Sequence, residues 1–286
     1  MTGWLRPWFL ALAAGWGVLL LVLALAAYGD DPTVPSEQDI ATARVTADRA
    51  AVEVAVAAGQ QAAVKVSRFQ LVETCDISLV RSGVDYRRRV ELFTEPGAEV
   101  ALLKRIAARL PESYQASYAS TGGAPWGALD QGDSNQPDGP RLAARADKFV
   151  QVQGSWGGAR TGVVQVEIRT GCRPAGDPVA HIQPRLRPAE QDQLDAVFEL
   201  AGITPDQGAA PSVEAIDCGA GQLRSFQMRV DAVPDRPLGD VVALASPDVH
   251  VLIGDRRLLA YRQGEWSVLA KADDHATTVH VTRSDC

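Results

Sequence analysis

The chain begins with an apolar run that few structures can accommodate. Residues Phe9 to Tyr28 form twenty consecutive residues without a charge, and Asp30 follows almost at once. A helix of about 20 apolar residues crosses ~30 Å of hydrocarbon, and the rings of Trp8 and Tyr28 lie near the ends of the run, where aromatic side chains prefer the membrane interface. The sequence therefore predicts a single-pass transmembrane signal anchor within residues 1–28, with the amino terminus in the cytoplasm and the bulk of the chain outside.

A cleaved signal peptide is the alternative for the same segment. Ala24, Leu25 and Ala26 supply the small-x-small pattern that a signal peptidase accepts, and a chain cleaved near Ala26 would be secreted. Signal-peptide cores typically run to only ~7–15 residues, whereas this apolar core continues to the cleavage site. The anchor is therefore favoured, and both interpretations place the folded part in an oxidising compartment.

Composition limits the partners of this chain. Its formal net charge is -7 and its pI is near 5.2. A nucleic-acid binder needs a basic surface for phosphate contacts, so no nucleic-acid partner is expected. Membrane contact is expected through residues 9–28 and not through electrostatic docking on anionic lipid.

The remaining chain divides into two regions of mixed helix and strand pattern. We expect a linker at residues 29–36, a first α+β domain at 37–175 that opens with a connecting helix, a Pro-rich linker at 176–189 and a smaller second α+β domain at 190–286. The first domain should contain a helix from Glu37 to Gly59 capped by Ser36, and a hairpin of Phe69–Val80 and Val84–Phe93 that turns at Arg81–Gly83.

Further elements follow from periodicity and from turn residues. In the first domain the pattern predicts a helix over Val100–Leu110, strands over Tyr114–Tyr118, Phe149–Val152 and Val163–Ile168, and an exposed loop over Thr121–Pro140. In the second domain it predicts helices over Glu190–Leu200 and Leu238–Ala245, and strands from Val213 onward that include Leu223–Val233, Val249–Ile253, Leu258–Tyr261, Trp266–Ala270 and Thr277–Thr282.

Four cysteines fall as one pair in each predicted domain. Cys75 opens the β-rich part of the first domain and Cys172 closes it, whereas Cys218 opens the second and Cys286 ends the chain. We predict the disulfides Cys75–Cys172 and Cys218–Cys286, although four cysteines allow three pairings. A zinc site is not expected, because no CxxC pair or closely spaced histidine partner is present.

Short matches between the two halves indicate a divergent internal duplication. The triplet Arg89-Val90-Glu91 resembles Arg229-Val230-Asp231, and an arginine, Arg169 or Arg283, lies three residues before each closing cysteine. Any two units with a hairpin and a helix share matches of this length, which is the competing explanation. The predicted fold class is α+β, with a transmembrane helix followed by two small sheet-plus-helix units, each with one disulfide.

No residue pattern in the chain predicts a catalytic, cofactor or metal site. His280 alternates with valines, as an outward strand residue would, and His275 follows Asp273 and Asp274 in what reads as a polar hairpin turn. Arg87, Arg88 and Arg89 are consecutive on a strand, so their side chains alternate between its faces. Three further patterns are explained at least as well by a structural role as by a functional site. They are the acidic loop Asp130–Asp138, the glycines of 154–158, and the tryptophans Trp126, Trp156 and Trp266.

The chain also resembles a group of known proteins. The apolar amino-terminal segment, the alanine-rich stretch, Cys75, the run from Tyr86 to Leu110 and the closing Thr170-Gly171-Cys172-Arg173 resemble membrane-anchored extracytoplasmic proteins of high-GC Gram-positive bacteria. That group has no assigned activity. The resemblance covers mainly residues 1 to 175 and implies a location in the cell envelope.

We therefore expect a membrane-anchored, non-enzymatic envelope protein that binds a protein partner or a cell-wall ligand through a sheet face or edge. The alternative is an anchored or secreted hydrolase with a site between the two units, using His275 or His250 with a carboxylate. A mechanical spacer is a third interpretation.

Overall fold

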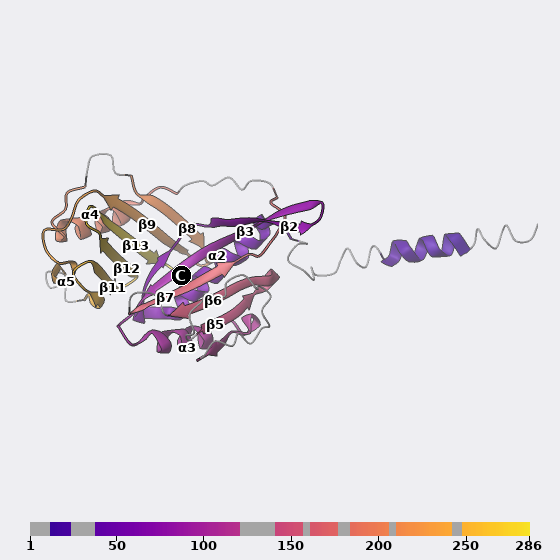
Figure 1. Cartoon of the computed structure of the whole chain (residues 1–286), viewed down its shortest axis with the longest axis horizontal. Coiled ribbons are helices and arrows are strands. Elements are labelled where there is room, and N and C mark those ends of the chain that lie inside the picture. Colours follow the sequence, from indigo (N-terminus) through magenta and orange to yellow (C-terminus); the bar gives the residue numbers. More distant parts are fainter. Residues whose placement is uncertain are drawn as a thin grey trace, which may run out of the picture.

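The folded part of the chain contains two antiparallel sheets with helices. The computed structural model describes residues 12–23, 38–120, 141–156, 161–176, 184–205, 210–241 and 248–286. Figure 1 shows the first sheet beside α2 and α3, and the second sheet beside α4 and α5. This α+β class with two sheet regions and two disulfides is the one predicted.

Only part of the predicted anchor falls within these ranges. Residues 12–23 are helical and exposed, whereas the rest of the segment, the cleavage pattern at Ala24–Ala26, the linker at 29–36 and the capping residue Ser36 lie outside the described residues. None of the helices in the described ranges combines the length and the apolar character needed to span a bilayer.

The first unit runs from α2 to β7. Its sheet has the order β1-β3-β7-β6-β5-β4, with β2 also paired to β3, and all pairs are antiparallel. The elements are α2 (Ile40–Ala58), η2 (Gly59–Gln61), β1 (Ala63–Val66), β2 (Gln70–Ser78), β3 (Arg81–Phe93), α3 (Glu99–Arg109), η3 (Glu112–Tyr114), β4 (Ser117–Ala119), β5 (Arg141–Ala146), η4 (Asp147–Phe149), β6 (Val150–Trp156) and β7 (Val163–Arg169).

The second unit runs from α4 to β13. Its sheet has the order β10-β11-β12-β13-β9-β8, again fully antiparallel. The elements are α4 (Pro188–Leu200), β8 (Ser212–Asp217), β9 (Gln222–Val230), α5 (Leu238–Val241), β10 (His250–Gly254), β11 (Leu258–Gln263), β12 (Trp266–Ala272) and β13 (Thr277–Ser284).

The two units share one strand order. When β2, which lies off the main path of the first sheet, is set aside, each unit starts with a helix and two paired strands and continues with a second helix. Four more strands follow, and the last of them pairs with the second of the first two strands, as β7 does with β3 and β13 with β9. Each also has a buried arginine on that second strand paired with an acid on the first helix: Arg88 with Asp48, and Arg224 with Glu190. Both acids lie ten residues before the last residue of their helix.

The two triplets Arg89-Val90-Glu91 and Arg229-Val230-Asp231, whose similarity suggested the duplication, do not lie at corresponding positions in the two units. Arg89 follows Arg88 by one residue on β3, whereas Arg229 follows Arg224 by five on β9, so the two triplets do not occupy corresponding places. The likeness between the units lies in strand order and in the two helix-to-strand ion pairs, which short identities do not capture.

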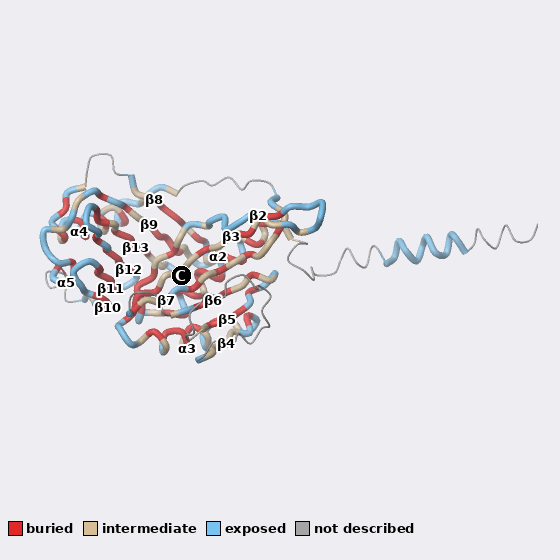
Figure 2. The backbone as a smooth tube through the Cα atoms, in the orientation of Figure 1, coloured by how far each residue is buried: buried red, intermediate tan, exposed pale blue. Residues whose placement is uncertain are grey.

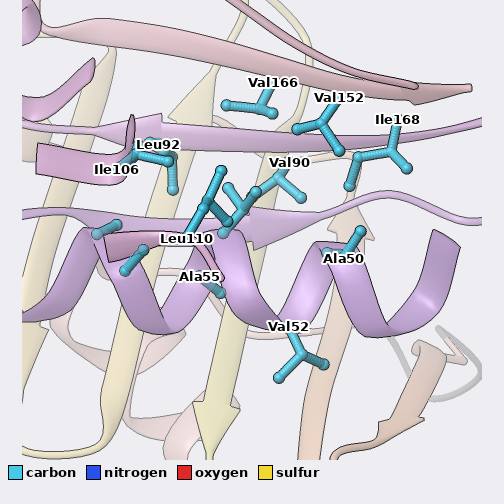
Figure 3. Packing of buried hydrophobic residues seen from close by; sticks show 14 of the residues in the cluster. Ala50, Val52, Ala55, Val90, Leu92, Ile106, Leu110, Val152, Val166 and Ile168 are labelled. Atoms are coloured by element: carbon cyan, nitrogen blue, oxygen red, sulfur yellow. The ribbon is translucent and has the colours of Figure 1, made fainter. Parts of the chain in front are cut away.

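Helix α2 is buried on opposite sides, which explains its alanine-rich composition. Figure 3 shows Ala50 close beside the strands that carry Val90, Val152 and Ile168, whereas Val52 points away from them. The helix also contacts β8 of the second unit, and Ile216 and Leu223 from that unit join the same core cluster. Small side chains allow strands to approach a helix from two directions, so α2 joins the units.

The two sheets differ in how they are covered. Helix α4 packs on one face of the second sheet through Phe198 and its neighbours, and β1 with Phe93 packs on the other face. With both faces covered, β11 and β12 contain nearly unbroken runs of buried residues, whereas β6 and β7 alternate buried with more exposed positions. The first sheet therefore keeps one face open over most of its width, and only the edge at Ala63, Phe93 and Val163 is covered by the second sheet.

Both predicted disulfides are present. Cys75 pairs with Cys172 and Cys218 with Cys286, closing loops with sequence separations of 97 and 68 residues. In the chain-entropy account, loops of this size stabilise a fold by about 4–5 kcal/mol each, and measured values are often lower. Each bridge ties the first hairpin of a unit to the end of its last strand.

Most predicted helices and strands are present, with local differences. The hairpin turns at Leu79 and Val80, so the predicted turn at Arg81–Gly83 is wrong and these residues begin β3. Asp39 caps α2 by accepting a hydrogen bond from the Thr42 amide at 2.8 Å. The strand predicted at Tyr114–Tyr118 is replaced by η3 followed by the short β4. Strand β5 was not predicted, and the loop at Thr121–Pro140 lies outside the described residues.

Candidate functional site

The open face of the first sheet is the candidate site. Along β7, Val164, Val166 and Ile168 point into the core, so Gln165 and Glu167 lie on the opposite face. The same alternation on the other strands defines the open face by its polar members: Lys65, Arg87, Arg89, Glu91, Ser117, Arg141, Arg145, Gln151, Gln153, Ser155, Gln165, Glu167 and Arg169. Figure 2 shows tan and red alternating along β5, β6 and β7.

Strand register arranges these side chains in three rows across the sheet. One row contains Arg87, Arg169, Gln151 and Arg145. The next contains Arg89, Glu167, Gln153 and Ser117, with Ala143 between the last two. The third contains Lys65, Glu91, Gln165, Ser155 and Arg141. Neighbouring strands are ~4.8 Å apart, so each row of polar side chains is about 15–20 Å long.

Positive charge exceeds negative charge on this face. Among the residues named above, six cations stand against two carboxylates. Two further acids lie beside Arg169 at the edge of the first row: the buried Asp85 and the exposed Glu73, whose Oε1 is 3.5 Å from Nη2 of Arg169. Glu167 is shared, since its Oε2 lies 3.5 Å from Nη1 of Arg87 and 3.7 Å from Nη2 of Arg89. Glu91 pairs with Lys65 at 2.9 Å. A chain with net charge -7 thus has a cationic sheet face.

Arg88 lies on the opposite side of β3 from Arg87 and Arg89, which confirms the predicted alternation. Its side chain is 1% exposed, and Nε lies 2.8 Å from Oδ1 of Asp48 while Nη1 lies 3.8 Å from Oε2 of Glu214. Nη1 also donates to the Ser67 carbonyl at 2.8 Å. Burial raises the pKa of Asp48, with Arg88 and Arg44 opposing the shift. This cluster holds α2, β3 and β8 together and offers no access to a ligand.

The histidines that could serve a hydrolase lie in three different settings. Nε2 of His250 is 3.3 Å from Oε1 of Glu95 across the two units, with both side chains more than half exposed. His275 lies in the predicted polar turn, where its amide donates to Oδ1 of Asp273 at 2.9 Å. The prediction for His280 was wrong, because it is 8% exposed and faces Lys65. Burial, with Lys65 nearby, lowers the pKa of His280 to about 3.

The remaining sequence candidates have structural roles where they are described. Gly154, Ser155 and Trp156 belong to strand β6 and not to a nucleophile elbow. A Cβ at Gly154 would lie 3.1 Å from Leu103, so the glycine allows α3 to pack closely on the strand. Trp266 packs edge-on against Phe226, with the Arg283 guanidinium over its ring. Trp126 and the acidic loop Asp130–Asp138 lie outside the described residues.

Comparison of the chain with protein-family models, curated proteins and solved structures gives no match in any of the three. The open face is therefore assigned as the candidate site from its geometry alone. The residues that form it were not predicted as a site, although the alternation in Val163–Ile168 and in Arg87–Arg89 carried the signal.

Proposed function

We propose that this protein is a non-enzymatic binding protein of the cell envelope, and that the open face of its first sheet takes an acidic protein partner. The observation that carries the proposal is the three-row cationic surface in a chain of net charge -7. Complementary charge steers such a partner toward this face and disfavours docking elsewhere on the acidic chain.

The width of the face favours a protein over a small ligand. Small-molecule sites are concave and mostly apolar, whereas this face is polar and carries arginine, glutamine and serine side chains from five strands. Arginine forms bidentate bonds with carboxylates, and glutamines supply further hydrogen-bond partners. An anionic cell-wall polymer is the competing ligand, and the experiment below separates the two.

The hydrolase alternative is less well supported. His250 and Glu95 do meet between the units, as that alternative requires, but both are exposed and their pairing is screened by solvent. His275 is committed to a turn by its backbone, and His280 is buried beneath the first unit. The proposal therefore gives these histidines no catalytic role.

Membrane anchoring through residues 9–28 is the second part of the proposal. It is supported by the length of the uncharged run, by its aromatic flanks and by the two disulfides, which fit an extracytoplasmic location. The shared strand order and the matching ion pairs of Arg88 and Arg224 further support an origin of the two units by duplication, after which only the first kept an open face.

Affinity capture with charge-neutralised variants tests the proposal. Tagged full-length protein is solubilised from its native membrane, and bound material is recovered at about 50 mM salt. The variant Arg87→Gln/Arg89→Gln removes two cations from the open face, and Arg229→Gln/Arg257→Gln removes two exposed cations from the second unit as a matched control. We expect the first variant to recover at least about ten-fold less of an acidic protein than wild type does. The control variant should recover as much of it as wild type.

Two outcomes would contradict the proposal. Equal loss of the partner in both double variants would show that net charge and not the open face governs binding. Recovery of envelope polysaccharide without any protein, with the same dependence on Arg87 and Arg89, would assign the face to the cell-wall ligand instead.

A further inference from the structure

The β2–β3 hairpin ends in an exposed apolar tip. Leu79 and Val80 form the turn with relative exposures of 106% and 96%, more than any other large hydrophobic side chain in the described part of the chain. Leu71 and Val72 on β2 are exposed at 51% and 36%. Apolar side chains that protrude this far are costly in water unless something covers them.

The base of the hairpin is fixed to the body. The Cys75–Cys172 disulfide joins β2 to the segment after β7, and Val84 exchanges backbone hydrogen bonds with Arg173 at 2.8 and 3.0 Å. A Cβ on Gly83 would lie 2.7 Å from the Arg173 carbonyl, so this glycine permits the close approach of the two segments. The side chain of Arg173 is fully buried and donates from Nε to the Thr170 carbonyl at 2.6 Å. The hairpin therefore points in a fixed direction.

The chain enters the folded body beside this base. The amide of Ile40, the first residue of α2, donates to the Pro174 carbonyl at 3.1 Å, two residues beyond Cys172. Figure 1 shows the β2–β3 hairpin projecting past the end of the body at which α2 begins, and Figure 2 shows its tip exposed. The hairpin thus projects from the end of the body at which α2 begins.

The length of the connection limits how far this end can move from an anchor. Eleven residues separate the end of the proposed anchor at residue 28 from α2, and even a fully extended chain of that length spans at most roughly 40 Å. A tether of limited length raises the effective concentration of the tip at the surface in which the proposed anchor is embedded.

The chemistry of the tip suits a lipid surface. Residues 77–80 carry no charge, and Arg81, the residue that follows, can contact anionic headgroups. Val80 donates its amide to Oγ of Ser78 at 3.4 Å, which satisfies part of the turn backbone that would otherwise need water.

We propose that Leu79 and Val80 insert into the interfacial layer of the same bilayer that holds the amino-terminal segment, so that the folded body has a second, weaker attachment point. This inference rests on the membrane anchoring proposed above. With two attachment points the body keeps one orientation to the membrane, and the open face of the first sheet is presented in a constant direction.

An environment-sensitive fluorophore tests the insertion. Full-length protein is reconstituted in phosphatidylcholine vesicles containing about a quarter phosphatidylglycerol, with the probe on Leu79→Cys or, as a control, on Val233→Cys. Val233 is also apolar and 50% exposed, but lies between β9 and α5 in the second unit. We expect a blue shift and at least about two-fold quenching by spin-labelled lipid at position 79, and neither at position 233. Adding Val80→Asp should abolish the quenching at position 79.

Vesicle flotation distinguishes failure of this inference from failure of anchoring. If the labelled protein floats with the vesicles while the probe at position 79 reports water, anchoring stands and the insertion is wrong. If the protein does not float, the anchoring fails and the insertion fails with it. A probe that is aqueous in lipid vesicles but covered in native membranes would assign the tip to a protein partner and overturn the proposal.

Discussion

Nε of Arg88 lies 2.8 Å from Oδ1 of Asp48 in a cluster where the arginine is 1% exposed, and Glu214 of the second unit lies on its other side. One side chain thus neutralises a carboxylate from α2 and a carboxylate from β8. Breaking a buried ion pair leaves an uncompensated charge, which costs more than the pair itself contributes.

Replacing Arg88 by methionine should lower the free energy of unfolding by about 3–5 kcal/mol at neutral pH. Arg68→Met is the matched control, because Arg68 contacts the same Glu214 at 3.6 Å from a side chain that is 47% exposed. The control should lose less than about 1 kcal/mol. Denaturant titration of both variants measures the difference, and equal losses would contradict a central role for the buried arginine.

The deficit of Arg88→Met should also depend on pH. Burial already raises the pKa of Asp48 above its ordinary value of 3.8, and loss of Arg88 should raise it further. A carboxyl with a raised folded pKa binds its proton more tightly in the folded state, so acidification favours folding relative to neutral pH. The difference in unfolding free energy between wild type and variant should therefore shrink from pH 7 toward pH 5. A constant difference would mean that Asp48 stays ionised.

His280 should make the protein sensitive to mild acid. Its folded pKa is lowered to about 3 from 6.5 by burial and by Lys65, so protons bind the unfolded state first. Stability from the neutral imidazole is complete above pH 6.5 and declines as pH falls toward 3. Between pH 7.5 and 5, wild type should lose roughly 2 kcal/mol more than His280→Leu. Parallel stability curves for the two proteins would refute this account.

Removal of either disulfide should destabilise its own unit without changing the open face. Cys75→Ser/Cys172→Ser and Cys218→Ser/Cys286→Ser are each expected to lower the unfolding free energy by about 2–5 kcal/mol. The first pair should in addition increase amide exchange in the β2–β3 hairpin, which that bridge fixes at its base. Faster exchange confined to the second unit in the first variant would be inconsistent with the observed pairing.

Loss of His250 separates the binding function from the hydrolase alternative. His250→Ala removes the contact with Glu95 at 3.3 Å between exposed side chains, so stability should change by less than about 0.5 kcal/mol. Partner capture should be unchanged. A variant that folds normally but loses its biological activity would favour a catalytic histidine.

Local sequence signals predicted much of this fold. The alternation in Val163–Ile168 is typical of a strand with one buried face, and the spacing of Val100, Leu103 and Ile106 is typical of a helix with one buried face. Both β7 and α3 were predicted correctly from these patterns. The cysteine positions predicted both bridges. Strand β5 has Leu142 as its one large apolar residue and otherwise alternates alanines with arginines, so its alternation is weak and the strand was missed.

Contacts between the two units could not be predicted from local sequence patterns. His280 reads as an outward strand residue, and only the packing of β1 across the second sheet buries it. The alanines of α2 likewise indicate a helix but not that it is covered from two sides. The open face could be inferred only once it was known that the second sheet is covered on both faces and the first on one.

Site-specific photo-crosslinking in the native membrane tests the central claim most directly. Gln153 is exposed in the middle row of the open face, and Ala196 is exposed on α4 of the second unit. A crosslinker at position 153 should capture an acidic protein, and the double substitution Arg87→Gln/Arg89→Gln should abolish this capture. A crosslinker at position 196 should capture none of that protein. Capture of the same protein from position 196 but not from 153, or no capture from 153 by a folded chain, would contradict the assignment of the open face as the binding surface.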